Sequence, residues 1–335
     1  MLDRILNKEN LTQQEAELLM SQIMSGEFTE NQISGILVAL AAKGEMVDEI
    51  TGFARAMREK ATKIPVDRIN GEIVFDCCGT GGTGSGVFNV STLVALIIAA
   101  AGIKVAKHGN RGATSKCGSA DILENLGLKL ISDTTAVSHS ITQTHFGFLF
   151  APFLHKAMKY AIQPRRELGV RTVFNILGPL TNPADANYQL MGVFDSRLTE
   201  TIAKVLGNLG VKRAMVVNGD GNLDEVSTIG KTKISELNNG VVKTFFVTPE
   251  QFGIQRAKIE DIRGGEIQDN LRIAMDILRG KKGPKRDIVV LNASFALKVC
   301  DAVESIEDGI VKVEQLLDSG KVLAKLQQIK ELSAK

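Results

Sequence analysis

The chain has 335 residues, of which 44% are hydrophobic and 23% are charged, and its formal net charge is +2. This length and composition are typical of two globular domains with a sizeable core, which excludes gross disorder. The near-neutral charge does not favour a nucleic-acid-binding protein, and the longest apolar run, residues 93–103, is well short of the roughly 20 residues that a membrane-spanning helix requires.

The four cysteines form no CxxC pair and have no spacing with histidine that suits zinc. The first residues also lack the apolar stretch of a signal peptide. We therefore expect a cytoplasmic protein with reduced thiols and no membrane partner.

The first 63 residues or so carry the pattern of helices. Residues 12–15 and 29–32 are capping boxes, and each is followed by apolar residues at helical spacing. A third helix is expected from about residue 47. Three short helices with narrow apolar stripes cannot make a large core alone, so we expect them to pack on another part of the chain or on a partner subunit. Residues 65–71 are the expected linker.

From residue 72 onward, short apolar strands alternate with helices. This alternation predicts an α/β fold with a mostly parallel sheet flanked by helices. We expect a small all-helical domain over residues 1–66, with a segment near 163–185 that returns to it, and a larger α/β domain over residues 72–335. The expected strands are 73–76, 104–107, 147–150, 214–218, 242–247 and 287–292. The expected helices are 90–101, 117–126, 199–208, 270–279, 294–304 and 310–332.

A glycine-rich stretch, residues 79–86, follows the first expected strand and leads to an apolar helix that begins near Asn89. No Asp or Glu lies between Asp76 and Asp121. Glycines let backbone N–H groups approach anionic oxygens, and the N-terminus of a helix is positive. The stretch therefore predicts a phosphate site. The basic residues inside it are Lys104, Lys107, Arg111 and Lys116.

Residues 79–84 match the GxGxxG pattern, so a dinucleotide site has to be considered. That motif needs an acid about 20 residues further on, at the end of the next strand. Here the next strand ends in Lys107 and His108, which does not fit. A Walker A loop is excluded because no Gly-Lys-Ser/Thr follows. A glycine turn used only for packing remains the alternative, but it explains this many glycines beside a basic loop less well.

Asp224 and Glu225 are adjacent acids in a loop that follows the expected strand 214–218. Mg²⁺ in phosphate chemistry is usually held by one or two carboxylates together with the substrate phosphates. An isolated pair of this kind is more often two solvated acids on a turn. Because loops after parallel strands meet at one sheet edge, the pair is expected near the phosphate loop, which favours a metal site.

Residues 164–172 are rich in arginine, whose planar side chain suits a carboxylate. A surface salt bridge with Glu167 is the alternative, and the spacing does not exclude it. His108 is the only histidine that we expect near the chemistry. The other three are expected in the core or at the surface: His139, His145 and His155.

Taken together, these segments resemble the anthranilate phosphoribosyltransferase family over essentially the whole chain. The resemblance implies transfer of the phosphoribosyl group of phosphoribosyl pyrophosphate to the amine of anthranilate, in L-tryptophan biosynthesis, with Mg²⁺ as cofactor. It also implies a homodimer through the helical domains, with no nucleic acid as partner. The matching segments are 79–82, 88–92, 107–111, 118–121, 165–172, 174–184 and 224–225.

The resemblance also implies roles for single residues, with no general acid or base among them. Ser91, Asp224 and Glu225 would hold magnesium. Anthranilate would contact Gly79, His108, Asn110 and Arg165. Donor binding falls on a larger set: Gly79, Gly82, Thr83, Val87, Asn89, Val90, Ser91, Thr92, Lys107, His108, Gly109, Asn110, Arg111, Gly112, Ala113, Thr114, Ser115 and Ser119.

Two positions depart from the family's usual pattern, which has Asp where this chain has Thr83 and Thr where it has Val87. Loss of an acid beside a pyrophosphate removes a repulsion and a potential magnesium contact, so we expect any effect to fall on metal dependence and donor affinity and not on the reaction itself. Val87 lacks a hydroxyl that could donate to a phosphate.

Two other functions are compatible with parts of the pattern. A pyrimidine nucleoside phosphorylase would place free phosphate and a base in the same cleft, but Asp224, Glu225 and the arginine-rich segment favour the transferase. A non-catalytic homologue that binds nucleic acid is disfavoured by the near-neutral charge and by the intact acid pair.

Overall fold

The structure is a computed structural model, and it describes residues 1–67, 71–112 and 116–334. The chain begins with α1 (Leu2–Leu6), α2 (Gln13–Ser25), α3 (Glu30–Lys43) and α4 (Val47–Lys60). The two predicted capping boxes are confirmed, because Thr12 and Thr29 each exchange hydrogen bonds with the residue three positions later. Each such cap stabilises its helix by about 1 kcal/mol.

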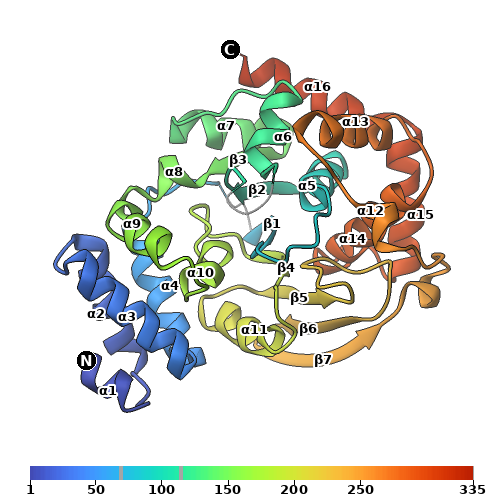
Figure 1. The fold of residues 1–335 in the computed structure, drawn as a ribbon. Coiled ribbons are helices and arrows are strands. Elements are labelled where there is room, and N and C mark those ends of the chain that lie inside the picture. Colours follow the sequence, from blue (N-terminus) through green and yellow to red (C-terminus); the bar gives the residue numbers. More distant parts are fainter. Residues whose placement is uncertain (68–70, 113–115, 335) are drawn as a thin grey trace.

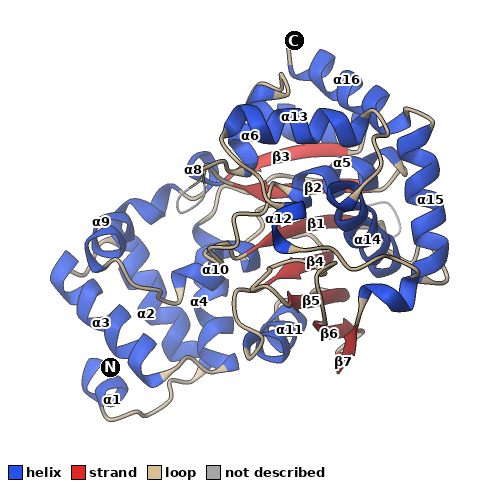
Figure 2. Cartoon of the chain, turned by 45° about the vertical axis from the view of Figure 1, so that its right-hand side comes forward, coloured by secondary structure: helices blue, strands red, loops and turns tan. Residues whose placement is uncertain are grey.

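A seven-stranded sheet runs through the rest of the chain in the order β3-β2-β1-β4-β5-β6-β7 (Figure 2). All pairs from β3 to β5 are parallel, and β6 and β7 are added antiparallel. The prediction of a mostly parallel sheet flanked by helices is therefore confirmed. The strands are β1 (Val74–Gly79), β2 (Lys104–Gly109), β3 (Phe146–Phe150), β4 (Tyr188–Gly192), β5 (Arg213–Gly219), β6 (Thr232–Asn238) and β7 (Val241–Val247).

Helices cover both faces of the sheet, and the strand side chains alternate between two cores. Leu190 and Met215 belong to one hydrophobic core, whereas their chain neighbours Met191 and Val216 belong to the other. The helical elements of this part are α5 (Val90–Ala100), α6 (Ser119–Asn125), α7 (Thr134–Thr144), α8 (Ala151–Leu154), η2 (Lys156–Met158), α9 (Lys159–Leu168), α10 (Phe174–Leu180), α11 (Leu198–Asn208), η3 (Pro249–Phe252), α12 (Ile259–Ile262), α13 (Ile267–Leu278), α14 (Pro284–Val299), α15 (Ile306–Asp318) and α16 (Lys321–Ser333).

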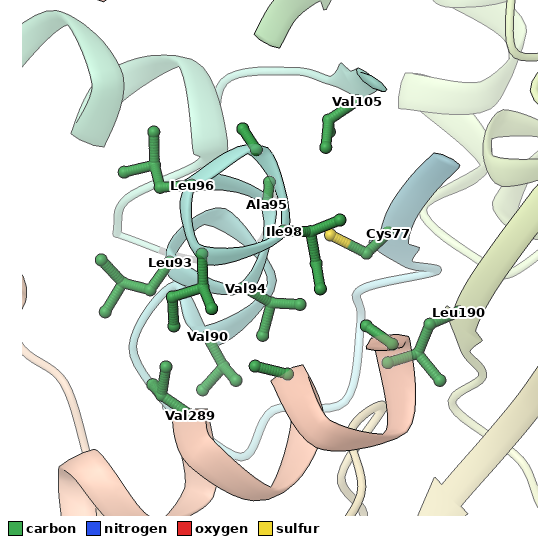
Figure 3. Close-up of a cluster of buried hydrophobic side chains, with 14 of the residues drawn as sticks. Cys77, Val90, Leu93, Val94, Ala95, Leu96, Ile98, Val105, Leu190 and Val289 are labelled. Atoms are coloured by element: carbon green, nitrogen blue, oxygen red, sulfur yellow. The ribbon is translucent and has the colours of Figure 1, made fainter. Parts of the chain in front are cut away.

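Helix α5 lies at the centre of the first core, between the sheet and α14. Figure 3 shows its apolar side chains facing Cys77 of β1, Val105 of β2, Leu190 of β4 and Val289 of α14. This burial fixes the N-terminus of α5 directly behind the end of β1. Across the described ranges, the structure contains no helix with the length and apolar character needed to cross a bilayer.

The prediction of a strand at 287–292 is wrong, because these residues lie inside α14. Every residue from 288 to 297 is buried, so the helix has no exposed polar face and its sequence does not show the helical period. The sequence signal for a helix lies upstream of this run, at Pro284 in the first turn of α14. The predicted helix 310–332 is two helices, α15 and α16, since Gly320 between them has φ +73°.

Strands β4 and β6 were not predicted. Polar residues interrupt both of them, as Gln189 does in β4 and Glu236 does in β6, so neither forms a clear apolar run. Both are identified by their pairing with neighbouring strands, β4 with β1 and β5, and β6 with β5 and β7.

The segment between β3 and β4 lies beside the N-terminal helices. Figure 1 shows α9 next to α2 and α3, and α10 between α4 and the sheet. Ala161 and Leu177 of this segment share a core with Leu37 and Phe53 of the N-terminal helices. The segment therefore forms a wall that faces the carboxyl ends of β1 and β2.

Candidate active site

A cleft of about 750 Å³ lies between the carboxyl edge of the parallel strands and the wall formed by α8, α9 and α10. Gly82, Lys107 and Glu225 all line it, so the three loops that the sequence analysis singled out meet in one cavity. The cleft is also lined by these residues predicted from the sequence: Gly79, Asn89, Ser91, Thr92, His108, Gly109, Asn110, Arg111, Gly112, Ser119, Arg165 and Asp224.

The described lining of the cleft omits six residues of the predicted donor set. Thr83, Val87 and Val90 are not part of the described lining of the cleft. The Thr83 hydroxyl lies 2.8 Å from the Ser85 hydroxyl, and Val90 is 1% exposed in the first core. The remaining three, Ala113, Thr114 and Ser115, fall outside the described residues.

The loop that carries Asp224 and Glu225 packs directly against the ends of β1 and β4, and no space is left between Asp224 and the glycines at those ends. A Cβ atom on Gly79 would lie 2.0 Å from Asp224 Oδ2, and one on Gly192 would lie 1.6 Å from the Asp224 carbonyl oxygen. Glycine is therefore required at both strand ends, because any side chain would displace Asp224.

The N-terminus of α5 and the end of β2 bring polar groups together at the cleft floor. Lys107 is 1% exposed. Its Nζ lies 2.8 Å from the Cys77 carbonyl oxygen and 3.3 Å from Ser91 Oγ. Asn89 Oδ1 and Thr92 Oγ1 are buried and have no hydrogen-bond partner among the described residues. Buried polar atoms without partners usually receive a ligand or water, so this floor is suited to an oxygen-rich ligand.

Asp76 holds the end of β2 in place from below the floor. Its carboxylate is fully buried and accepts hydrogen bonds from the His108 N–H at 3.2 Å and from Asn182 Nδ2 at 2.8 Å. Burial raises the pKa of Asp76, and the nearby charge of Lys107 opposes that rise. The carboxylate thereby fixes the backbone at His108 and stabilises the buried ammonium group.

The Asp224 and Glu225 carboxylates face the cleft but are crowded by protein atoms. Burial, together with the charge of Asp224, raises the pKa of Glu225 to about 8, against the opposing effects of Lys107 and of the Ser91 N–H. Burial also raises the pKa of Asp224, whose Oδ2 accepts the Gly81 N–H at 2.9 Å. No lysine or arginine in the described ranges forms an ion pair with either carboxylate.

A bound cation would stabilise the charged forms of the Asp224 and Glu225 carboxylates, so these residues fit a metal ion. The described residues contain no group of three or more His, Cys, Asp or Glu side chains placed to hold a metal ion. Two carboxylates and the Ser91 hydroxyl leave further positions for water or for a ligand's phosphate oxygens. This incomplete set of oxygen ligands is typical of Mg²⁺ and not of a structural metal.

Two histidines line the cleft, whereas the sequence analysis placed only His108 there. His155 follows β3 at the same sheet edge, and its ring centroid lies 5.0 Å from that of His108. The position of His155 after an expected strand was the sequence signal that could have placed it in the cleft.

His108 Nδ1 lies 3.1 Å from the Gly178 carbonyl oxygen, so this nitrogen carries the proton and Nε2 is an acceptor. Burial lowers the pKa of His108 to about 3 and that of His155 to about 4, so both are neutral.

This neutrality should make the fold sensitive to acid. The pKa of His108 in the unfolded chain is about 6.5, so between about 6.5 and 3 the unfolded state binds more protons. Stability is therefore full above pH 6.5 and is lost as the pH falls. We expect the Tm to drop less between pH 7 and pH 4.5 in His108→Gln than in the wild type. Differential scanning fluorimetry measures both slopes, with the exposed His139→Gln as the control. Equal slopes for His108→Gln and the wild type would contradict the assignment.

Arg165 of α9 lies across the cleft from the strand ends. It stacks over the Phe174 ring with 5.1 Å between the guanidinium carbon and the ring centroid. Glu167 accepts a hydrogen bond from Gln163, and no ion pair between Glu167 and an arginine of residues 164–172 occurs among the described residues. The surface salt bridge considered from the sequence is therefore wrong. Burial lowers the pKa of Arg165, and no acid offsets this.

Arg111, in contrast, is already engaged by acids. Its Nη1 lies 2.9 Å from Asp121 Oδ1 and 2.6 Å from Glu124 Oε2. It lines the cleft but is held at the first turn of α6.

Much of the lining of the cleft was not predicted. These residues come from α4, from the loops that follow the strands and from the α8–α10 segment, and most of them are apolar or small, with His155, Lys156, Lys159 and Asn175 as exceptions. They are Met57, Cys78, Thr80, Gly81, Cys117, Gly118, Ala151, Pro152, His155, Lys156, Met158, Lys159, Ile162, Phe174, Asn175, Gly178, Pro179 and Thr181.

Comparison with known proteins agrees with this arrangement. Residues 71–323 match the model of the glycosyl transferase family a/b domain, and residues 1–61 match the helical bundle domain of the same family. The anthranilate phosphoribosyltransferase of Petrotoga mobilis is 49% identical over 332 residues, which are 99% of this chain and 96% of the relative. The chain belongs to the anthranilate phosphoribosyltransferase family.

Solved structures of the family have the same fold. The anthranilate phosphoribosyltransferase of Thermus thermophilus superimposes with a TM-score of 0.93 at 40% identity, covering 100% of this chain and 99% of that one. The Saccharomyces cerevisiae enzyme in complex with PRPP and Mg superimposes with a TM-score of 0.90 at 27% identity, covering 99% and 96%.

Proposed function

We propose that the cleft is where this chain transfers the phosphoribosyl group of phosphoribosyl pyrophosphate to the amine of anthranilate, with N-(5-phosphoribosyl)-anthranilate and pyrophosphate as products. The observation that carries this proposal is the meeting of Gly82, Lys107 and Glu225 in one cavity, opposite Arg165. Family membership and the relative that binds PRPP and Mg support it.

The donor occupies the half of the cleft formed by the strand ends and α5. Lys107 offers its ammonium group to phosphate oxygens, together with backbone N–H groups of the glycine loop. The unpartnered Asn89 Oδ1 and Thr92 Oγ1 are available to the hydroxyls of the donor. Mg²⁺ held by Asp224, Glu225 and Ser91 supplies positive charge for the leaving pyrophosphate.

The acceptor occupies the half formed by α8, α9 and α10. Arg165 is a cation placed for the anthranilate carboxylate, and Asn110 and His108 lie on the facing strand end. Neutral His108 and His155 add no charge there. An aromatic amine is an adequate nucleophile when neutral, so the protein's task is alignment, and no general base is assigned.

Loss of anthranilate fluorescence on addition of phosphoribosyl pyrophosphate and Mg²⁺ tests the function directly. We expect turnover with anthranilate and no phosphorolysis of thymidine. Phosphorolysis of thymidine without anthranilate turnover would assign the chain to the phosphorylase alternative.

Arg165→Ala should raise the anthranilate KM by about 10- to 100-fold, since a hydrogen-bonded charged group is worth about 1.5–3 kcal/mol. The KM for the donor should stay within about 2-fold, because Arg165 lies on the far wall of the cleft. Steady-state kinetics with each substrate varied in turn provides the measurement. Arg166→Ala, the exposed neighbour, is the matched control and should behave like the wild type. Equal rises in both KM values would argue against an acceptor role.

We further propose the two-domain division, with residues 1–66 and the 163–185 segment closing against residues 72–335. We also propose a homodimer through the helical domain, which would cover exposed apolar side chains of its helices. Leu6, Leu18 and Val38 are 62%, 53% and 45% exposed. Analytical ultracentrifugation of the chain and of Leu18→Asp tests the dimer. A cytoplasmic location remains a prediction from the sequence.

A further inference from the structure

A short turn behind the cleft joins the two loops that line its proposed donor half. They are the glycine loop, here residues 79–89, and the second loop, between β2 and α6, of which the structure describes residues 110–112 and 116–118. This bracing turn, residues 263–266, connects α12 to α13. Arg263 forms an isolated antiparallel bridge with Val87, and the Gly264 N–H donates to the Gly86 carbonyl oxygen at 2.8 Å. The end of the glycine loop is therefore paired with the bracing turn as if with a neighbouring strand.

Asn270, in the first turns of α13, connects the bracing turn to the second loop. Its side chain is 6% exposed. Oδ1 accepts the Gly265 N–H at 3.0 Å, and Nδ2 donates to the Gly265 carbonyl oxygen at 3.3 Å. Burial raises the pKa of the Cys117 thiol, and the neighbouring Asn270 side chain opposes this rise. One amide group therefore contacts the bracing turn and the second loop at once.

A direct hydrogen bond also joins the glycine loop to the second loop at the cleft. The Cys117 carbonyl oxygen accepts a hydrogen bond from Asn89 Nδ2 at 3.0 Å, and Asn89 ends the glycine loop. On the surface, Lys116 and Glu266 form an ion pair between the second loop and the bracing turn. The two loops are thus held against each other at the front by Asn89 and at the back by Asn270.

The packing at the back leaves no room for independent movement. A Cβ atom on Gly264 would lie 2.4 Å from Asn270 Oδ1 and 3.0 Å from Phe88 Cα. Gly264 is therefore enclosed between Asn270 and the glycine loop, so a displacement of Asn270 is transmitted to Phe88 and Asn89. Asn270 itself is not among the described lining of the cleft.

We propose that Asn270 is a positioning residue for the phosphoribosyl donor. It holds the glycine loop and the second loop at the separation that lets both contact one donor molecule. Binding by backbone N–H groups depends on their orientation before the ligand arrives, so loosening the loops weakens donor binding without changing the acceptor wall. This inference rests on the proposed function, because it assigns the donor to these loops.

The chain offers a matched control. Asn187 is 5% exposed and also grips backbone groups, with Oδ1 accepting the Val74 N–H at 2.8 Å and Nδ2 donating to the Glu72 carbonyl oxygen at 3.2 Å. It lies at the amino end of β1, away from the cleft. Asn187→Ala therefore removes the same kind of buried amide as Asn270→Ala, but at the other edge of the sheet.

The test compares both variants with the wild type by thermal denaturation, steady-state kinetics and calorimetric titration with phosphoribosyl pyrophosphate and Mg²⁺. We expect similar losses in Tm. Asn270→Ala should raise the donor KM and Kd about 10-fold and leave the anthranilate KM unchanged, whereas Asn187→Ala should leave all three constants unchanged. If Asn270→Ala does not fold, Asn270→Ser measured at 10 °C replaces it, with the same expected split.

Several outcomes would overturn the inference. They are an unchanged donor KM and Kd in Asn270→Ala, equal rises for donor and acceptor, and the same rise in Asn187→Ala. If the wild type turns over and only the Asn270 result fails, the proposed function stands and the positioning role does not. If the wild type neither turns over nor binds the donor, both are wrong.

Discussion

The double variant Asp224→Asn, Glu225→Gln should lower kcat/KM for the donor by about 1000-fold or more. Both carboxylates are proposed to hold the Mg²⁺ that balances charge on the leaving pyrophosphate, and removing a single electrostatic contact of this type lowers rates by about 100- to 1000-fold. The amides keep the shape of the side chains but cannot supply the negative charge that binds the cation. Anthranilate fluorescence over a Mg²⁺ titration gives the measurement.

The loss should not come from unfolding. Burial already disfavours the charged forms of both side chains, so neutral amides should leave the Tm unchanged or higher at pH 8. Asp220→Asn is the matched control, because Asp220 belongs to the same loop but does not line the cleft. It should retain wild-type turnover. Magnesium-dependent turnover that survives in the double variant would remove the metal site from this position.

Lys107→Met should lower kcat/KM for the donor by about 100- to 1000-fold, the second largest effect that we expect. Lys107 is 1% exposed, and its ammonium group is held between the Cys77 carbonyl oxygen and the Ser91 hydroxyl, so no flexible surface lysine can take its place. Methionine has a similar length and fills the space without charge. Steady-state kinetics with varied donor measures the change.

Lys104→Met provides the comparison on the same strand. Lys104 Nζ lies 2.6 Å from Glu72 Oε2, at the other end of β2 from the cleft. This variant should lose some stability and keep its kinetic constants. If Lys107→Met binds the donor as tightly as Lys104→Met does, the phosphate contact assigned to Lys107 is wrong.

The meeting of three loops in one cleft could be predicted because each loop has a local signal in the sequence. The glycines after β1, Lys107 at the end of β2 and Asp224 after β5 each follow a strand, and the ends of parallel strands share one edge. Arg165 needed the family resemblance, because its place opposite the sheet depends on α9 packing against α2 and α3.

The other features of the cleft and the fold depend on tertiary contacts that the sequence pattern does not show. His155 was expected away from the chemistry, since a lone histidine gives no sequence signal and only the end of β3 places it beside His108. Arg111 was predicted to bind the donor, and the sequence did not indicate that Asp121 and Glu124 of the following helix form ion pairs with it. The strand predicted at 287–292 failed because a fully buried helix loses the period that identifies it.

The two walls of the cleft differ in what they are made of, and this bears on attempts to change the enzyme's substrates. The proposed donor wall is largely main chain, and at Gly79 it has no room for even one added methyl group. The opposite wall is built from side chains such as Met57, Met158 and Ile162, which stand on separate helices. Variation of these side chains can reshape the pocket for substituted aromatic amines while the sugar-phosphate chemistry is left intact.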